Sequence, residues 1–398
     1  MKKYLIIGNG VAGTTAAEHI RKLDNRGNIT IVTEENISFY YRIRLNEYVS
    51  GNLNEKDLIV KGEDWYKDKR IDLKLSTPIT GAEPLKKIVT TEDNQRLSYD
   101  CLLIATGSHS FVPPIKGSEK RGVFALRSIQ EARDISAWAG DIEDVVLIGG
   151  GLLGLEAGKA LQKLKKRVRV VEFFPRLLPR QLDVDGAKRL QIIMEGMGFS
   201  FRLGAKTQEI MGDDKVESVL LEGGEKLTAG MVIISAGVRP NMELVEPLGL
   251  DHDKGIKVDE YLRTNQPDIY AAGDVAEFKG IPYGIWPAAM EQGKIAGTNI
   301  AGGNMIYKGT TMANTLKVVG IDLASAGDID AENRLEAKTV TDEKVYKKIV
   351  LENDQIIGCI MLGDTKGFNK ITKAMSEKQN VSEIKDLILS VGFELKGL

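Results

Sequence analysis

Cysteine and histidine are scarce in this sequence of 398 residues, which contains 2 cysteines and 3 histidines. The cysteines, Cys101 and Cys359, cannot supply the four thiolates of an iron–sulfur cluster or of an all-cysteine zinc site. They also form no C-x-x-C pair for dithiol exchange. The histidines are scattered along the chain, which excludes a helical H-E-x-x-H metal site. Any redox chemistry must therefore depend on a bound organic cofactor.

The sequence also lacks an excess of positive charge and any long apolar run. Its 54 lysines and arginines nearly balance 56 aspartates and glutamates, which leaves a net charge of −2. Since nucleic-acid binding needs a basic excess, we expect no nucleic-acid partner. No apolar run approaches the length of a membrane span, and the apolar stretch near the N-terminus is too short for a secretory signal. Together with the sparse cysteine, these features predict a soluble cytoplasmic protein.

Glycine, by contrast, is abundant, and its first cluster forms a motif. An apolar stretch over residues 4–7 leads into this motif, and a helical pattern over residues 14–23 follows it. In a strand, G-x-G-x-x-G, helix arrangement, the glycines permit a tight turn, close approach of a pyrophosphate and close helix packing. The sequence therefore predicts a dinucleotide site formed by Gly8, Gly10, Val11, Ala12 and Gly13.

Two acids follow the next predicted strand, over residues 28–32. These are Glu34 and Glu35, which lie about 20 residues past the last glycine of the motif. A carboxylate at this position can accept hydrogen bonds from a ribose 2′-hydroxyl. Both acids are therefore candidate ligands of the first dinucleotide.

The same order of features returns over residues 145–172. A strand over 145–148 precedes the second motif, a helix is predicted over 155–165, and a strand over 168–171 ends on Glu172. Glu172 favours NAD(H), because an acid repels the 2′-phosphate of NADP(H). A single G-x-G-x-x-G is weak evidence, whereas two copies in the same context are specific. We expect the second dinucleotide to lie on Gly149, Gly151, Leu152, Leu153 and Gly154.

Each half of the repeat also closes in the same way. An apolar strand over residues 99–104 ends in Ala105, Thr106 and Gly107, and a second one over 231–234 leads to Gly237. The repetition predicts a duplicated α/β unit that holds two different dinucleotides. Ala105, Thr106 and Gly107 are assigned to the first site, and Gly237 to the second.

A later strand, loop and helix suit either a flavin site or an ordinary connection. The strand over residues 269–272 is followed by Gly273 and Asp274, and Asp274 can accept hydrogen bonds from sugar or ribityl hydroxyls. The helix that begins at Trp286 has a small-residue face, and its N-terminal dipole would stabilise negative charge on a reduced flavin.

Taken together, these motifs and Ala-Gly-Val-Arg-Pro-Asn at 236–241 resemble the pyridine nucleotide–disulfide oxidoreductases over about the first 300 residues. The resemblance implies FAD at the first site and NADH at the second, with Asp274 and Trp286 near FAD. It implies an α/β fold with two Rossmann-like, glutathione-reductase-type domains and a small α/β C-terminal domain. The expected boundaries are 1–112 with 242–308 for FAD, 113–241 for NAD(H), and 309–398 for a C-terminal interface domain.

One segment departs from the branches of the family that reduce disulfides or peroxide. Their Ser-Phe-x-x-Cys appears here with Arg42 in place of the cysteine. Both cysteines of this chain lie in apolar strand patterns that are typical of small buried side chains. Residues 41–45, Tyr-Arg-Ile-Arg-Leu, resemble instead the rubredoxin-reductase branch, to which the flavin domain of assimilatory nitrite reductases is related. Ile43 departs from the proline that is usual in that branch.

The family resemblance implies that Arg42 is a catalytic cation beside the flavin and that it pairs with Glu156. Such a pair would favour the charge of the reduced flavin and orient the nicotinamide. Two simpler interpretations stay open, namely a surface guanidinium for Arg42 and an acid in the first turn of a helix for Glu156.

We therefore predict an FAD-dependent NADH oxidoreductase, without redox-active cysteine, that passes electrons to a small iron–sulfur protein such as rubredoxin. An NADH-oxidising flavin subunit of a larger iron–sulfur complex, an NADH oxidase and a redox-sensing flavoprotein of low turnover are the alternatives. For the C-terminal region, the pattern predicts a hairpin over 345–351 and 356–362, and helices over 368–378 and 381–389.

Overall fold

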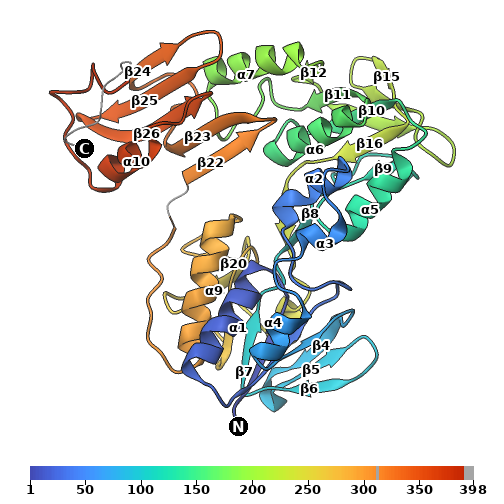
Figure 1. Ribbon diagram of the computed structural model, residues 1–398, viewed down its shortest axis with the longest axis vertical. Helices are drawn as coiled ribbons and strands as arrows, with labels where there is room; N and C mark the ends of the chain where they lie inside the picture. Colours follow the sequence, from blue (N-terminus) through green and yellow to red (C-terminus); the bar gives the residue numbers. More distant parts are fainter. Residues whose placement is uncertain (311–312, 390–398) are drawn as a thin grey trace. The chain divides into compact units, whose positions relative to one another are not determined.

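The computed structural model describes residues 1–310 and 313–389, and the chain divides into two compact units (Figure 1). Unit 1 contains the first glycine motif, and unit 2 contains the second motif together with the C-terminal region. Because unit 2 holds both of these parts, the three-domain boundaries expected from sequence stay predictions. Unit 1 consists of Met1–Arg44, Asn54–His109 and Val238–Thr310, and the described part of unit 2 consists of residues 45–53, 110–237 and 313–389.

Unit 1 is built on a five-stranded parallel sheet in the order β19-β7-β1-β2-β3. The strands are β1 (Lys3–Ile7), β2 (Asn28–Val32), β3 (Ile71–Lys74), β7 (Cys101–Ile104) and β19 (Ile269–Ala271). Side chains of β1 alternate between two apolar cores, with Ile6 in one and Leu5 in the other. Because the sheet is covered on both faces, its central strands are almost wholly apolar.

Helices α1 (Val11–Leu23) and α9 (Trp286–Ile300) pack side by side against one of these faces (Figure 1). The small residues of α9 permit this contact. A Cβ atom at Gly293 would lie 2.4 Å from the carbonyl oxygen of Ala12, and one at Gly297 would lie 2.4 Å from that of Ala16. The small-residue face of α9 therefore serves close helix packing.

Shorter elements complete unit 1. An antiparallel sheet, β4-β5-β6, follows β3 in the chain. The segment between β2 and β3 carries Arg42, one of the predicted catalytic residues. The elements are η1 (Arg42–Arg44), α3 (Glu55–Leu58), α4 (Glu63–Asp68), β4 (Ile79–Glu83), η2 (Pro84–Lys86), β5 (Ile88–Thr91), β6 (Arg96–Ser98), β8 (Ser108–Ser110), β17 (Val238–Pro240), α8 (Val245–Leu248), β18 (Ile256–Val258), β20 (Ala276–Phe278) and β21 (Ile281–Pro282).

Unit 2 repeats the plan of unit 1, with a parallel sheet in the order β12-β11-β10-β16-β9. Its central strand β10 pairs with β11 and β16 as β1 pairs with β2 and β7, and an antiparallel sheet, β13-β14-β15, again follows. The predicted duplication and the α/β fold class are therefore confirmed. The elements are α2 (Leu45–Val49), β9 (Val123–Phe124), α5 (Ile129–Trp138), β10 (Asp144–Ile148), α6 (Leu152–Lys163), β11 (Arg167–Glu172), α7 (Val184–Gly196), β12 (Ser200–Leu203), β13 (Thr207–Met211), β14 (Ser218–Leu221), β15 (Lys226–Thr228) and β16 (Met231–Ile234).

The C-terminal region forms an antiparallel sheet in the order β22-β23-β26-β25-β24, with α10 packed against it. The predicted hairpin is present as β25 and β26, and the first predicted helix is present as α10. The second predicted helix, over 381–389, is wrong. Residues 382–389 form turns, in which the amide N–H groups of Ile384 and Leu387 donate to carbonyls three residues earlier and that of Ile388 donates to the carbonyl of Ile384. The elements are β22 (Ala313–Val318), β23 (Ile321–Gly327), β24 (Glu336–Thr341), β25 (Tyr346–Glu352), β26 (Gln355–Leu362) and α10 (Phe368–Ser376).

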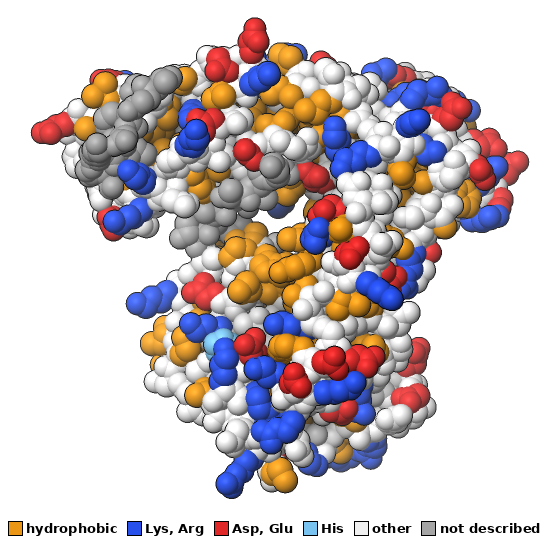
Figure 2. Space-filling model, in the orientation of Figure 1, with side chains coloured by type: hydrophobic (Ala, Val, Ile, Leu, Met, Phe, Trp, Pro, Cys, Tyr) orange, Lys and Arg blue, Asp and Glu red, His pale blue; other side chains and the backbone are white. Residues whose placement is uncertain are grey.

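The surface carries both charge signs in mixture. Figure 2 shows lysine and arginine side chains interspersed with aspartate and glutamate side chains over the visible face. Within the described ranges, no helix combines the length and the apolarity that a membrane crossing requires.

Candidate functional site

The first glycine motif connects β1 to α1 and forms an open cradle. Gly8 has φ +112°, and a Cβ atom there would lie 2.1 Å from the carbonyl oxygen of Ala105. A Cβ atom at Gly13 would lie 2.0 Å from the carbonyl oxygen of Gly8, so both positions exclude larger residues. At Gly10, by contrast, a Cβ atom would have no neighbour within 4 Å. The space beside Gly10, at the N-terminus of the 13-residue helix α1, fits the pyrophosphate of a dinucleotide.

Three strand ends meet at this cradle. The amide N–H of Ala105, just after β7, donates to the carbonyl of Ile7 at 2.8 Å. The Oγ atom of Ser108 donates to Oδ2 of Asp274, which follows β19, at 2.8 Å. The carboxyl ends of β1, β7 and β19 therefore bring the motif, the Ala105–Gly107 turn and Asp274 to one edge of the sheet.

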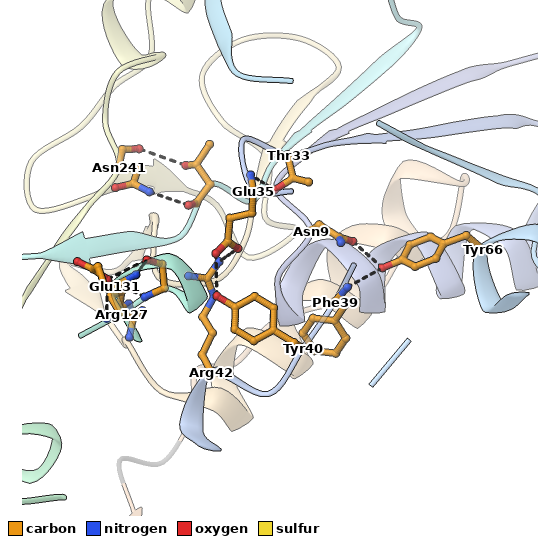
Figure 3. A network of polar contacts seen from close by, with 12 residues as sticks. Asn9, Thr33, Glu35, Phe39, Tyr40, Arg42, Tyr66, Arg127, Glu131 and Asn241 are labelled. Carbon is orange, nitrogen blue, oxygen red and sulfur yellow. Dashed lines mark hydrogen bonds and ion pairs between the residues drawn. The ribbon is translucent and has the colours of Figure 1, made fainter. Parts of the chain in front are cut away.

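The two acids after β2 have different surroundings. Glu34 is exposed, whereas the Glu35 carboxylate accepts a hydrogen bond from the Tyr40 hydroxyl at 2.7 Å and from Nη2 of Arg42 at 2.5 Å (Figure 3). The Arg42 side chain is 36% exposed and its guanidinium also lies over the Tyr40 ring. Arg42 thus anchors the segment after β2 to Glu35, which leaves Glu34 as the acid that is accessible to a ribose.

Trp286, the first residue of α9, belongs to an aromatic cluster. Its ring centroid lies 5.5 Å from that of Tyr41 and 6.0 Å from that of Phe39. The cluster brings the N-terminus of α9 next to the segment that carries Arg42. Trp286 and Arg42 are therefore positioned by the same stretch of chain.

Sequence reasoning missed Asn9 and Tyr66, which form a buried chain of hydrogen bonds (Figure 3). The amide N–H of Phe39 donates to the Tyr66 hydroxyl at 3.2 Å, and this hydroxyl donates to Oδ1 of Asn9 at 2.9 Å. Asn9 is 8% exposed and Tyr66 3%, and burial raises the pKa of Tyr66. The chain ties the glycine motif to the Arg42 segment. The only sequence signal was a polar residue inside the motif.

The amide group of Asn9 also provides a test of whether a cofactor fits here. Its Nδ2 atom is buried and has no hydrogen-bond partner among residues 1–310 and 313–389. Buried donors rarely stay unpaired in folded proteins. A dinucleotide, which is rich in oxygen acceptors, fits the cradle beside this donor.

We expect a Tyr66→Phe variant to be less stable by about 1–3 kcal/mol, because it leaves Asn9 Oδ1 and the Phe39 N–H without their buried partner. Urea unfolding followed by circular dichroism would measure the loss. Tyr41→Phe is the matched control, since no hydrogen bond of its hydroxyl is found in the described structure. Equal stability of the two variants would contradict a role for the Asn9–Tyr66–Phe39 chain.

The second cradle reproduces the first. Gly149 also has φ +112°, with a Cβ position 2.2 Å from the carbonyl oxygen of Ser235, and the Cβ position of Gly154 lies 2.7 Å from the carbonyl oxygen of Gly149. Gly151 and Gly237 have open space beside them, with no neighbour of a Cβ atom within 4 Å. Leu152 and Leu153 begin α6, so its N-terminus faces the space beside Gly151. The cradle fits a second dinucleotide.

Glu172, at the end of β11, is only 6% exposed. Its carboxylate accepts hydrogen bonds from the backbone N–H groups of Gly150 and Phe174. The acid is therefore fixed against the glycine motif. Its contact with NADH stays a prediction, as do the roles of the other cofactor residues.

Glu156 is the fifth residue of α6, so the alternative of an acid in the first helical turn is wrong. Burial raises the pKa of its carboxyl group, and the amide N–H of Val319 donates to Oε1 at 2.6 Å. Arg42 lies in unit 1 and Glu156 in unit 2, so their pairing stays a prediction.

Neither cysteine has the surroundings of a reactive thiol. Cys101 is 4% exposed and Cys359 is fully buried, and both are free thiols. Burial raises the pKa of Cys359 to about 12 and also raises that of Cys101. Within the described ranges, no group of three or more His, Cys, Asp or Glu residues could hold a metal ion.

Comparison with known proteins identifies the family. Residues 2–293 match the pyridine nucleotide-disulphide oxidoreductase family, and residues 313–379 match the rubredoxin NAD+ reductase C-terminal domain. The chain is 36% identical to a nitrite reductase [NAD(P)H] of Bacillus subtilis over 96% of this chain and 48% of that protein. It thus spans about half the length of the nitrite and nitrate reductase relatives that it matches.

Other relatives are matched over nearly their full length. The chain is 30% identical to the NADH-rubredoxin oxidoreductase of Clostridium acetobutylicum, over 97% of both chains, and the crystal structure of that protein superposes with a TM-score of 0.84. A NAD-dependent persulfide reductase from A. fulgidus, also 30% identical, superposes with a TM-score of 0.88 over 98% of this chain and 79% of that chain. The chain is therefore a member of the pyridine nucleotide–disulphide oxidoreductase family, which uses FAD and NADH, and it carries a C-terminal domain of the rubredoxin NAD+ reductase type.

Proposed function

We propose that this protein oxidises NADH through a bound FAD and delivers the electrons to a small iron–sulfur protein, with rubredoxin the favoured acceptor. The observation that carries the proposal is the pair of open cradles beside Gly10 and Gly151, in a chain whose thiols are both buried. The likeness to the NADH-rubredoxin oxidoreductase over 97% of both chains supports the acceptor.

In this proposal the first cradle holds FAD. The backbone beside Gly10 and the N-terminus of α1 bind its pyrophosphate, and Glu34 accepts from a ribose hydroxyl. Asp274, held by Ser108, accepts from the ribityl–pyrophosphate part. The Ala105–Gly107 turn borders the flavin, and Trp286 lies beside its ring.

NADH binds in the second cradle, with its pyrophosphate beside Gly151 and an adenosine ribose on Glu172. When bound, FAD accepts a hydride from NADH and can return the two electrons one at a time, so no protein nucleophile is needed. The protein residues supply position and charge. Arg42 favours negative charge near the flavin, and Glu156 orients the nicotinamide.

A second function is favoured by the length of the relatives. The chain spans about half the length of the nitrite reductase relatives. In this alternative, it serves as the NADH-oxidising flavin part of a larger iron–sulfur enzyme. Co-purification with iron–sulfur subunits would support this second function. A cytoplasmic location belongs to either proposal.

Steady-state assays with a panel of acceptors test the proposed acceptor. NADH oxidation should be faster with rubredoxin than with oxygen alone. If no iron–sulfur protein increases the rate above that seen with oxygen, the acceptor proposal fails and an NADH oxidase remains.

The proposal also requires that thiols take no part in turnover. We expect N-ethylmaleimide at pH 8 to leave Cys101 and Cys359 unmodified and the NADH-dependent activity unchanged, because burial disfavours both thiolates. Mass spectrometry would count the adducts, and the denatured protein, in which both thiols react, is the control. Activity that falls in step with labelling would contradict this expectation.

A further inference from the structure

The turn between β22 and β23 contacts α6, the helix that carries the predicted catalytic residue Glu156. The register pairs Val318 with Ile321, so the loop consists of Val319 and Gly320 only. The amide N–H of Val319 donates to Oε1 of Glu156 at 2.6 Å, within unit 2. A donor at this distance from a carboxylate makes a strong, charge-assisted hydrogen bond.

The turn adopts a conformation that its sequence does not favour. Val319 has φ +57° and Gly320 has φ +89°, the pattern of a type I′ turn, which prefers Asn-Gly or Gly-Gly. A β-branched residue with positive φ is a strained outlier and persists only when its surroundings hold it there. Val319 is buried, with 3% exposure, and its strained backbone presents the N–H to Glu156.

The C-terminal sheet that carries this turn has a second contact with the part of unit 2 that holds the second glycine motif. Nζ of Lys348, on β25, lies 3.1 Å from Oδ2 of Asp183, the N-cap residue of α7. The Tyr346 hydroxyl donates to the same Asp183 atom at 2.6 Å. Lys348 is 1% exposed and Asp183 fully buried, so this anchor is shielded from water. The anchor limits movement of the sheet, and therefore of the turn.

Glu156 has other charged neighbours that act on its carboxylate. Lys159 and Lys163, on α6 itself, favour the charged form, and Glu47 on α2 opposes it. Within residues 1–310 and 313–389, the Val319 N–H is the hydrogen-bond donor that fixes a direction for the Glu156 carboxylate, whereas Lys159, Lys163 and Glu47 act on it through charge alone.

We propose that the β22–β23 turn is a positioning element for Glu156, through which the C-terminal domain holds this carboxylate in the orientation that hydride transfer requires. The inference rests on the proposed function, because it assigns Glu156 to the nicotinamide site. Val319 acts through Glu156, so it is a positioning residue. The C-terminal domain thereby contributes to the NADH site through a backbone N–H, which every substitution at this position except Val319→Pro retains.

A mutant cycle at Val319 and Glu156 tests the proposal in the full-length holoprotein. Val319→Pro removes the N–H, and because its ring fixes φ at about −65° it also prevents the +57° conformation that directs this group at Glu156. Val319→Asn keeps the N–H in a residue that suits the turn. In rapid mixing at saturating NADH, flavin reduction should be about tenfold slower in Val319→Pro, the effect of one lost hydrogen bond to a charged group. Val319→Asn should match the wild type.

The second arm of the cycle separates positioning from a structural effect. In a Glu156→Ala background, Val319→Pro should cause no further slowing of flavin reduction. Val319→Pro alone should have the same FAD content and the same Kd for NADH as the wild type. Equal slowing in both backgrounds, or no slowing in the wild-type background, would overturn the proposal. If Val319→Pro does not fold, Gly320→Val, which disfavours the positive φ of the turn, replaces it with the same outcomes expected. Absence of NADH-dependent bleaching in the wild type would instead overturn the proposed function.

Discussion

A Gly10→Val variant is expected to fold normally and to purify without FAD. A side chain at Gly10 meets no protein atom within 4 Å, so the fold has room for it, but it occupies the space assigned to the pyrophosphate. We expect FAD affinity to fall by at least about 100-fold, because a steric penalty of about 3 kcal/mol raises the dissociation constant by two factors of ten. Absorbance at the flavin bands of the purified protein, against its circular dichroism, would measure both effects.

Gly151→Val is the matched variant at the second site, because Gly151 also has no neighbour within 4 Å of a Cβ atom. It should retain FAD, yet NADH should no longer bleach the flavin. Gly8→Val differs from both, since its Cβ atom would overlap the carbonyl of Ala105 and the fold itself should suffer. Retention of FAD by Gly10→Val, or loss of FAD by Gly151→Val, would contradict the assignment of the two cradles.

A Lys348→Met variant is expected to lose about 3–5 kcal/mol of stability, because removal of one partner leaves a buried, uncompensated charge on Asp183. Lys348 also donates to the carbonyl of Asp330 at 2.9 Å and to Oδ1 of Asn333 at 2.6 Å, and these acceptors lose their donor as well. Urea denaturation would measure the change in the free energy of unfolding.

Two controls make this prediction specific. Lys338, on β24 of the same sheet, pairs with Asp386, and their side chains are 36% and 74% exposed, so Lys338→Met should cost at most about 1 kcal/mol. Adding Asp183→Asn to Lys348→Met should restore part of the stability, because asparagine can still cap α7 without a charge. Similar losses for Lys348→Met and Lys338→Met would contradict a buried ion pair that anchors the C-terminal sheet.

The duplicated fold could be predicted because its signals are local. Each glycine motif stands between a strand and a helix, and the steric roles of Gly8 and Gly149 follow from one turn geometry. The apolar strands before Ala105 and Ser235 are also continuous in sequence. Such features depend on neighbours within a few residues, so the chain alone reveals them.

The remaining features depend on contacts between distant segments. Nothing near Asn9 in sequence indicates that Tyr66 would reach it, and nothing near Glu156 indicates the Val319 turn 163 residues later. Glu35 and Glu34 are indistinguishable by spacing, and only the fold shows that Tyr40 and Arg42 engage Glu35. The prediction of a helix over 381–389 was wrong, because the same spacing of apolar residues occurs in successive turns and in a helix.

The central claim is that electrons pass from NADH through FAD to an iron–sulfur protein without a protein thiol. An anaerobic titration of a Cys101→Ala/Cys359→Ala variant with NADH, followed by rapid mixing with oxidised rubredoxin, tests it most directly. We expect one equivalent of NADH to bleach each flavin, and rubredoxin to restore the flavin absorbance as fast as in the wild type. A flavin that NADH does not bleach, or a bleached flavin that rubredoxin leaves reduced, would contradict the claim.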